Sequence, residues 1–193
     1  MLEDLSQYIL DIAENSVKAK ASRVLIELKI DSKKKLISLC VCDDGCGMDE
    51  DLLKQVEDPF TTTRKERRVG LGVPFLKQAA LACDGFFEIT SEKGKGTIVK
   101  AGFRLDHIDC PPLGDVAATV ATLIMGWPWC HWIFRYEVDG NAFLLDLEEL
   151  LEYLLGDREL LKSPKFILWL KEYIQENMSL LHEKKGGDGI AQD

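Results

Sequence analysis

The sequence has few histidines, no excess of positive charge and no long uninterrupted apolar segment. Only three of its 193 residues are histidine, and none of its six cysteines forms a Cys-x-x-Cys pair, so we do not expect a zinc or iron–sulfur site. A net charge of −9 leaves no basic surface for nucleic acid or an anionic membrane. The N-terminus carries no basic region followed by an apolar run, so we expect no signal peptide and a cytoplasmic location.

One segment could be mistaken for a membrane span. Residues 116–134 contain no Asp, Glu, Lys or Arg, and their number is almost enough to cross a bilayer. Gly126 and Pro128 interrupt the segment, and it contains Thr119, Thr122 and His131. It therefore predicts a buried helix followed by a buried strand, and no membrane partner.

The acidity is concentrated in the second half of the chain. Residues 1–106 hold 17 basic and 18 acidic side chains, whereas residues 107–193 hold 7 and 15, for net charges of −1 and −8. A solvated surface explains this distribution, and so does an acidic face that binds a partner.

Hydrophobic periodicity divides the chain near Cys110–Pro112. Before this point we predict helices at 3–19, 50–56 and from Gly70 to about Cys83, strands at 23–30, 36–42, 86–91 and 97–105, and a loop at 58–69. After it we predict a helix at 115–125, a hairpin of 130–138 and 142–146 turned at Asp139–Gly140, helices at 147–155 and 164–182, and a disordered tail at 184–193. The predicted domains are therefore 1–106 and a small α+β extension at 107–183.

The first predicted helix carries three polar residues on one face. Asp11, Asn15 and Lys18 are spaced by four and three residues, so they align along the helix. An amide oxygen such as that of Asn15 suits Mg²⁺, and a carboxylate one turn earlier could orient or deprotonate water. A solvated polar face explains the same pattern.

Three glycine-containing segments follow it. Asp43-Asp-Gly-Cys-Gly-Met48 comes directly after a strand, where Gly45 and Gly47 permit a tight turn and Asp43 could accept a hydrogen bond from an exocyclic amine. Arg64-Lys-Glu-Arg-Arg-Val-Gly-Leu-Gly72 is a basic loop that enters a helix, a combination suited to phosphate. Gly94-Lys-Gly-Thr97 by itself predicts only a hairpin turn.

In order and spacing, these segments resemble the sequence boxes of the GHKL (gyrase, heat-shock chaperone, histidine kinase, mismatch repair) ATPase superfamily. Ile9–Lys18 resembles the N box, Asp43–Gly47 the G1 box, Asp58–Arg64 the F box, Val69–Val73 the G2 box, and Ser91–Thr97 the strand and turn that follow in histidine kinases. The resemblance covers residues 1–106 and is closest to histidine-kinase ATPase domains.

The resemblance implies ATP and Mg²⁺ as cofactors and assigns a role to each residue of the motifs. Asn15 would coordinate Mg²⁺, Asp43 would bind the adenine amino group, Thr97 would support Asp43, and Asp11 would be the catalytic residue. The other nucleotide contacts would be Lys18, Gly45, Gly47, Met48, Arg64, Lys65, Gly70, Leu71 and Gly72. The implied fold is a two-layer α/β sandwich of the Bergerat type, with a mixed sheet and helices on one face.

The sequence departs from this superfamily at three points, one of which is a short lid between Phe60 and Gly70. Members that hydrolyse ATP carry Glu where this chain has Asp11, whose side chain is one methylene shorter. We expect no phosphoacceptor helical hairpin before the N box, and none of the three histidines has a suitable context, so we do not expect histidine autophosphorylation.

The sequence leaves three functions open. The protein could be a stand-alone regulatory kinase similar to the anti-sigma-factor serine kinases or a slow ATPase, an ATP-gated interaction module, or a nucleotide sensor without turnover. A protein partner or substrate is expected, and a homodimer is compatible with the sequence. All four tryptophans lie after residue 126, where we expect them to pack in the core rather than bind a partner.

Overall fold

Alternating apolar residues give each central strand one buried face. In β1 (Arg23–Asp31) the buried positions are Val24, Ile26 and Leu28, and β2 (Leu36–Asp43) repeats the pattern. Since successive side chains point to opposite sides of a strand, this pattern commits one face of the sheet to the core.

The computed structural model describes residues 3–57 and 72–183. The remaining strands are β3 (Phe86–Glu92), β4 (Gly96–Arg104), β5 (His131–Val138) and β6 (Asn141–Asp146). The helices are α1 (Leu5–Lys18), α2 (Glu50–Glu57), α3 (Gly72–Ala82), α4 (Val116–Gly126), α5 (Leu147–Tyr153) and α6 (Pro164–Glu183), with a short 3-10 helix at Arg158–Lys162. The predicted F-box loop and tail lie outside the described residues.

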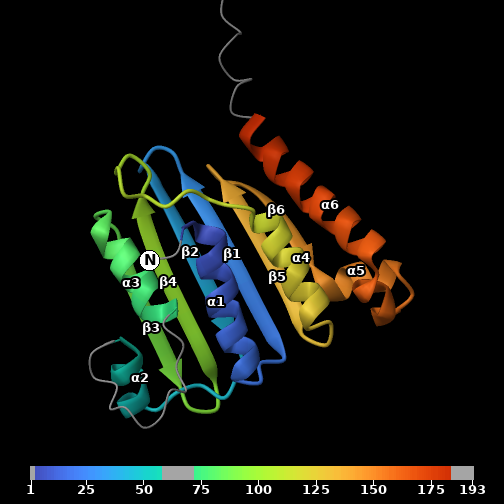
Figure 1. Ribbon diagram of the computed structural model, residues 1–193, viewed down its shortest axis with the longest axis horizontal. Helices are drawn as coiled ribbons and strands as arrows, with labels where there is room; N and C mark the ends of the chain where they lie inside the picture. The colour runs from blue at the N-terminus through green and yellow to red at the C-terminus, as the bar shows by residue number, and fades with distance from the viewer. Residues whose placement is uncertain (1–2, 58–71, 184–193) are drawn as a thin grey trace, which may run out of the picture.

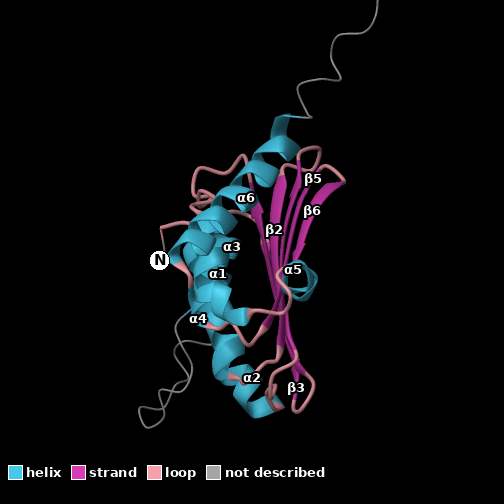
Figure 2. Ribbon diagram, turned by 90° about the vertical axis from the view of Figure 1, so that its right-hand side faces the viewer, coloured by secondary structure: helices cyan, strands magenta, loops and turns pink. Residues whose placement is uncertain are grey.

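The six strands form one mixed sheet in the order β3-β4-β2-β1-β5-β6. Neighbouring strands are antiparallel except β1 and β5, which pair in parallel. Helices α1, α3, α4 and α6 lie on one side of this sheet, whereas the short α5 lies on the other (Figure 2). The predicted mixed sheet with a helical layer is therefore confirmed.

The second half of the chain continues the sheet of the first. All eight residues of β5 pair with β1, from Arg23 opposite His131 to Ile30 opposite Val138. Helix α4 packs beside α1 (Figure 1), and the N–H groups of Leu5 and Ser6 donate to the carbonyls of Pro112 and Leu113, at 2.9 and 3.1 Å. One hydrophobic core therefore spans both predicted domains.

The uncharged segment 116–134 forms the 11-residue helix α4, a turn and the start of β5. This confirms the predicted buried helix and strand, and no helix in the described ranges is long and apolar enough to cross a membrane. The prediction that the tryptophans pack in the core is correct for Trp132, which is 2% exposed, but wrong for Trp129 and Trp169, which are 55% and 44% exposed.

Candidate functional site

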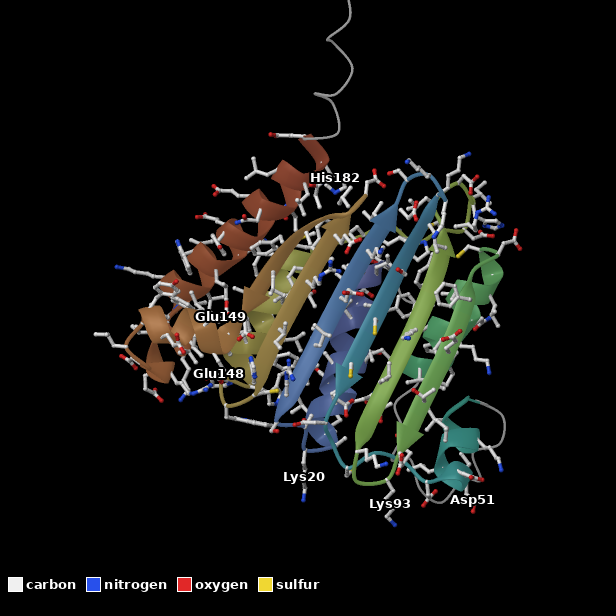
Figure 3. All side chains as sticks on the ribbon, turned by 180° about the vertical axis from the view of Figure 1, so that it is seen from behind. Lys20, Asp51, Lys93, Glu148, Glu149 and His182 are labelled. Atoms are coloured by element: carbon white, nitrogen blue, oxygen red, sulfur yellow. The ribbon has the colours of Figure 1, made fainter. Side chains whose placement is uncertain are left out.

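A cavity of about 340 Å³ lies between α1, α2, α3 and the sheet. It is at the end of the molecule where α1 ends, β3 turns into β4 and α2 begins, near the labelled residues Lys20, Lys93 and Asp51 (Figure 3). Its volume is within the range typical of small-molecule sites. Of the predicted site residues, the cavity is lined by Asn15, Lys18, Asp43, Gly47, Met48 and Thr97.

Two hydrogen bonds orient the carboxylate of Asp43 in the cavity wall. The Ser16 hydroxyl donates to its Oδ2 at 2.7 Å, and the Gly45 N–H donates to its Oδ1 at 2.9 Å. Ser16 is itself 2% exposed, so water does not compete with Asp43 for its hydroxyl group. Each carboxylate oxygen keeps a further acceptor position, which suits a ligand amine.

The loop after β2 needs glycine because backbone from the β3–β4 turn packs directly against it. Gly47 has φ +61°, and a Cβ there would lie 2.0 Å from the Glu92 carbonyl oxygen. Gly96 in the opposite turn has φ +104°, and its Cβ would lie 1.9 Å from the Asp43 carbonyl oxygen. Any side chain at either position would separate the two loops that form this end of the cavity.

Backbone hydrogen bonds fix the same loop on both sides. The Cys46 N–H donates to the Ala19 carbonyl at the end of α1, and the Cys46 carbonyl accepts from the Gly94 N–H, both at 2.8 Å. The β3–β4 turn, which by itself predicted only a hairpin, therefore holds the Asp43 loop on one side while the end of α1 holds it on the other.

Thr97 is the β4 partner of Asp43 in the sheet and belongs to a small hydroxyl network. Its hydroxyl lies 2.9 Å from that of Ser91, which also accepts from the Met48 N–H at 2.8 Å. Sequence reasoning gave Ser91 no role, although it begins the motif that ends at Thr97.

On α1, Asn15 and Lys18 face the cavity, and Asp11 lies one turn earlier outside its lining. Lys18 is 67% exposed and forms an ion pair with Glu14 at 3.2 Å. Within the described ranges, no cluster of three or more His, Cys, Asp or Glu side chains could hold a metal ion. An ion at Asn15 would leave positions for water and substrate phosphates, as Mg²⁺ commonly does.

Asp11 contacts the amino end of α3. A Cβ on Gly72 would lie 2.9 Å from the Asp11 Cβ and 3.1 Å from its Oδ2, so only glycine allows this approach without movement. Burial raises the pKa of the Asp11 carboxyl, the negative charge of Glu14 adds to this effect, and Lys18 opposes it. A carboxylate with a raised pKa beside a cavity is suited to accept a proton.

Most of the remaining wall is apolar. Sequence reasoning missed these residues because their periodicity predicts only core positions: Ile12, Ala19, Leu52, Val56, Val73, Ile89 and Val99, together with Ser16 and Cys46. An apolar wall with few polar groups is what a planar heterocyclic base requires. Arg64, Lys65, Gly70 and Leu71 lie outside the described residues.

Residues 2–107 match the family model described as "Histidine kinase-, DNA gyrase B-, and HSP90-like ATPase". This match covers more than half of the chain. The chain belongs to that family. It contains a histidine-kinase-like ATPase domain, and the GHKL resemblance of the sequence is confirmed.

Two curated relatives are sporulation kinases of Bacillus subtilis (strain 168). Sporulation kinase C is 32% identical over 94 residues, which are 49% of this chain and 22% of the relative. Sporulation kinase E is 36% identical over 97 residues, which are 49% and 13%. The chain thus spans less than a quarter of the length of either relative.

Among solved structures, the N-terminal domain of a DNA repair protein aligns with a TM-score of 0.53 and 14% identity. The alignment covers 75% of this chain and 53% of that one, and it extends beyond the part matched by the family model. This similarity concerns the fold alone.

Proposed function

We propose that this ATPase domain binds ATP with Mg²⁺ in the cavity beside Asp43 and acts as a regulator, either by phosphorylating a protein or by slow hydrolysis. The orientation of Asp43 is the observation that carries the proposal. Ser16 and Gly45 hold its carboxylate at the wall of an otherwise largely apolar cavity. This geometry fits a purine, because a fixed carboxylate can accept a hydrogen bond from the amino group while apolar side chains cover the ring.

The other residues divide the remaining tasks. Asn15 would offer its amide oxygen to Mg²⁺, which neutralises phosphate charge when bound. Lys18 would attract the phosphates after leaving its exposed ion pair with Glu14, which costs little because such pairs are weak. By family resemblance, Arg64, Lys65, Gly70, Leu71 and Gly72 would enclose the phosphates.

Phosphorylation of a protein is favoured by the names of the two relatives, both of which are kinases. The histidine-kinase-like sequence of residues 2–107 agrees with this assignment. Hydrolysis would use Asp11 to take a proton from water, with the raised pKa described above assisting that role.

The test uses γ-labelled ATP and Mg²⁺ with the full chain, alone and with an extract of its source organism. Released phosphate and labelled protein are followed together, and ATP affinity is measured by titration. We expect Asp43→Asn to weaken ATP binding by about 10- to 100-fold, because it removes a charge-assisted hydrogen bond. Asn15→Ala should abolish the Mg²⁺-dependent part of phosphate transfer or release.

Asn141→Ala is the matched control, since Asn141 is exposed at the start of β6. It should behave like the unmodified chain. Failure of the unmodified chain to bind millimolar ATP would overturn the proposal. A labelled protein band would identify a kinase, and phosphate release without a band an ATPase.

An ATP-gated interaction module is the alternative, and the position of α1 favours it. This helix presents Asn15 to the cavity and packs against α4 of the C-terminal segment. A nucleotide that displaces α1 would therefore move α4. Hydrogen exchange of residues 116–126, measured with and without ATP, tests this idea. If ATP binds tightly but the exchange rates do not change, the gated module is excluded and a nucleotide sensor is the remaining alternative.

A further inference from the structure

Helix α6 buries one seam and leaves the rest of its surface exposed, with its exposed residues arranged in rows. Its buried residues are Leu170, Ile174, Met178 and Leu181. On the outer face, Trp169, Tyr173 and Leu180 form an apolar row, while Glu172, Glu176 and Glu183 form an acidic row. Both rows have the same spacing of four and seven residues, so they run side by side along the helix.

The aromatic part of the apolar row is held rigidly although it is exposed. The Trp169 and Tyr173 rings stack at 5.4 Å between centroids with 12° between planes, and Tyr173 meets Phe143 of β6 edge-on at 5.7 Å. Phe143 in turn contacts the buried Phe134. Rigid aromatic side chains anchored to a core lose little entropy when a partner covers them.

The acidic row has no basic partner within the described part of the chain. The nearby Lys171 forms its ion pair with Asp115, the N-cap of α4, at 2.7 Å. Glu172, Glu176 and Glu183 are exposed and form no ion pair with a described residue. Three carboxylates along an apolar row repel anionic lipid and nucleic acid alike.

We propose that this face of α6 binds a basic amphipathic helix of a partner protein. Apolar residues of the partner would cover Trp169, Tyr173 and Leu180, while its lysines or arginines would pair with the three glutamates. Packing against α6 of a second copy would instead add three more glutamates and, within the described helix, only Lys165 as a basic residue on this face.

This surface is independent of the proposed nucleotide site. Helix α6 lies along the β6 edge of the sheet, whereas α2 and α3 lie at the β3 edge (Figure 1). Partner binding can therefore be tested without ATP, and failure of one proposal leaves the other standing.

The experiment measures fluorescence anisotropy of a labelled 18-residue helical peptide of leucine and lysine, at physiological salt. An equivalent peptide of leucine and glutamate is the control ligand. We expect the lysine peptide to bind, and Trp169→Ala or Glu172→Lys/Glu176→Lys to weaken it by about tenfold or more. Circular dichroism checks that each variant remains folded.

The matched control is Glu88→Lys/Asp109→Lys, which changes the net charge equally on other parts of the surface. It should change affinity by less than about twofold. Equal weakening by this control, equal binding of the glutamate peptide, or no binding of the lysine peptide would overturn the proposal. A dimer in sedimentation equilibrium that Trp169→Ala dissociates would assign the surface to a second copy instead.

Discussion

The sheet has an open cavity on one side of β1 and a densely packed core on the other. On one side, glycines at Gly47 and Gly96 let backbone segments approach closely and leave a cavity between helices and sheet. On the other side, β5 fills the space with Trp132, Phe134 and Tyr136, each at most 2% exposed. One continuous sheet thus carries an open ligand site beside two glycine-containing loops, while dense packing on the other side of β1 keeps the frame rigid.

Substitution of Asp11 should have the largest effect, which is on the rate of ATP hydrolysis, and it concerns only the cavity side of β1. If Asp11 is the base, Asp11→Asn slows ATP hydrolysis by about 10²–10⁴-fold without loss of ATP affinity. Burial raises the pKa of Asp11, so the folded state favours its ionised form less than the unfolded chain does, and the variant should not lose stability at neutral pH. In the unmodified chain, the hydrolysis rate should rise with pH through that raised pKa.

Rate against pH for both forms, with calorimetric ATP titration, checks this prediction. An unchanged hydrolysis rate in Asp11→Asn would show that Asp11 is not the base and that water is activated elsewhere.

Phe134→Ala should have the next largest effect, and it asks whether the two sides fold as one unit. The substitution leaves a void in the shared core and should cost about 3–5 kcal/mol of unfolding free energy. Urea unfolding is followed by tryptophan fluorescence, which reports only on the segment after residue 126, and by reactivity of the buried Cys83 thiol at the end of α3.

We expect both probes to shift together, because β1 and β5 share a strand pair along their whole length. Separate transitions would mean that residues 3–106 fold without the C-terminal segment, and the comparison would then describe two domains.

Gly47→Ala should have an intermediate effect, confined to the cavity side. The new methyl would collide with the Glu92 carbonyl and its backbone has positive φ, so we expect a loss of at least about 2 kcal/mol together with loss of ATP binding. Gly94→Ala is the control, since φ is +82° there but no atom lies within 4 Å of the new Cβ. It should cost about 1 kcal/mol and keep ATP affinity. Thermal melts and ATP titrations of both variants distinguish steric collision from backbone strain.

Glu137→Gln should have the smallest effect, on the β5 side. The Lys29 Nζ lies 2.9 Å from the Glu137 carboxylate, and Arg135 pairs with both Glu137 and Glu27. Lys29, and then Arg135, lower the pKa of Glu137 against the opposing effect of burial. Because the pKa of Glu137 is lowered in the folded state, its ionised form stabilises the fold at pH values above the unfolded-state pKa of about 4.5. This stabilisation is lost as the pH falls through the folded-state pKa.

The variant should therefore be less stable by about 1–2 kcal/mol at pH 7, with the difference shrinking below about pH 4.5. Urea midpoints across pH 3–7 measure it. A difference that stays constant with pH would assign the effect to packing rather than to charge.

Much of the fold and part of the site could be predicted from local sequence patterns. Helical and alternating periodicity located α1, the strands and the β5–β6 hairpin, while motif spacing selected Asn15, Asp43 and Thr97. Ser16 was missed because its role depends on where β2 ends, 27 residues later. The apolar wall was missed because Ile89 and Val99 look like ordinary core residues until a cavity forms beside them.

By itself, the sequence determined the elements, the family and the acidic character of the second half, because periodicity, motif spacing and composition are local properties. Only the tertiary structure decided that β5 pairs with β1, that a hairpin turn clamps the Asp43 loop, and that α6 exposes an aromatic row beside an acidic one. These features depend on contacts between distant residues, and their free energy exists only when the chain is folded.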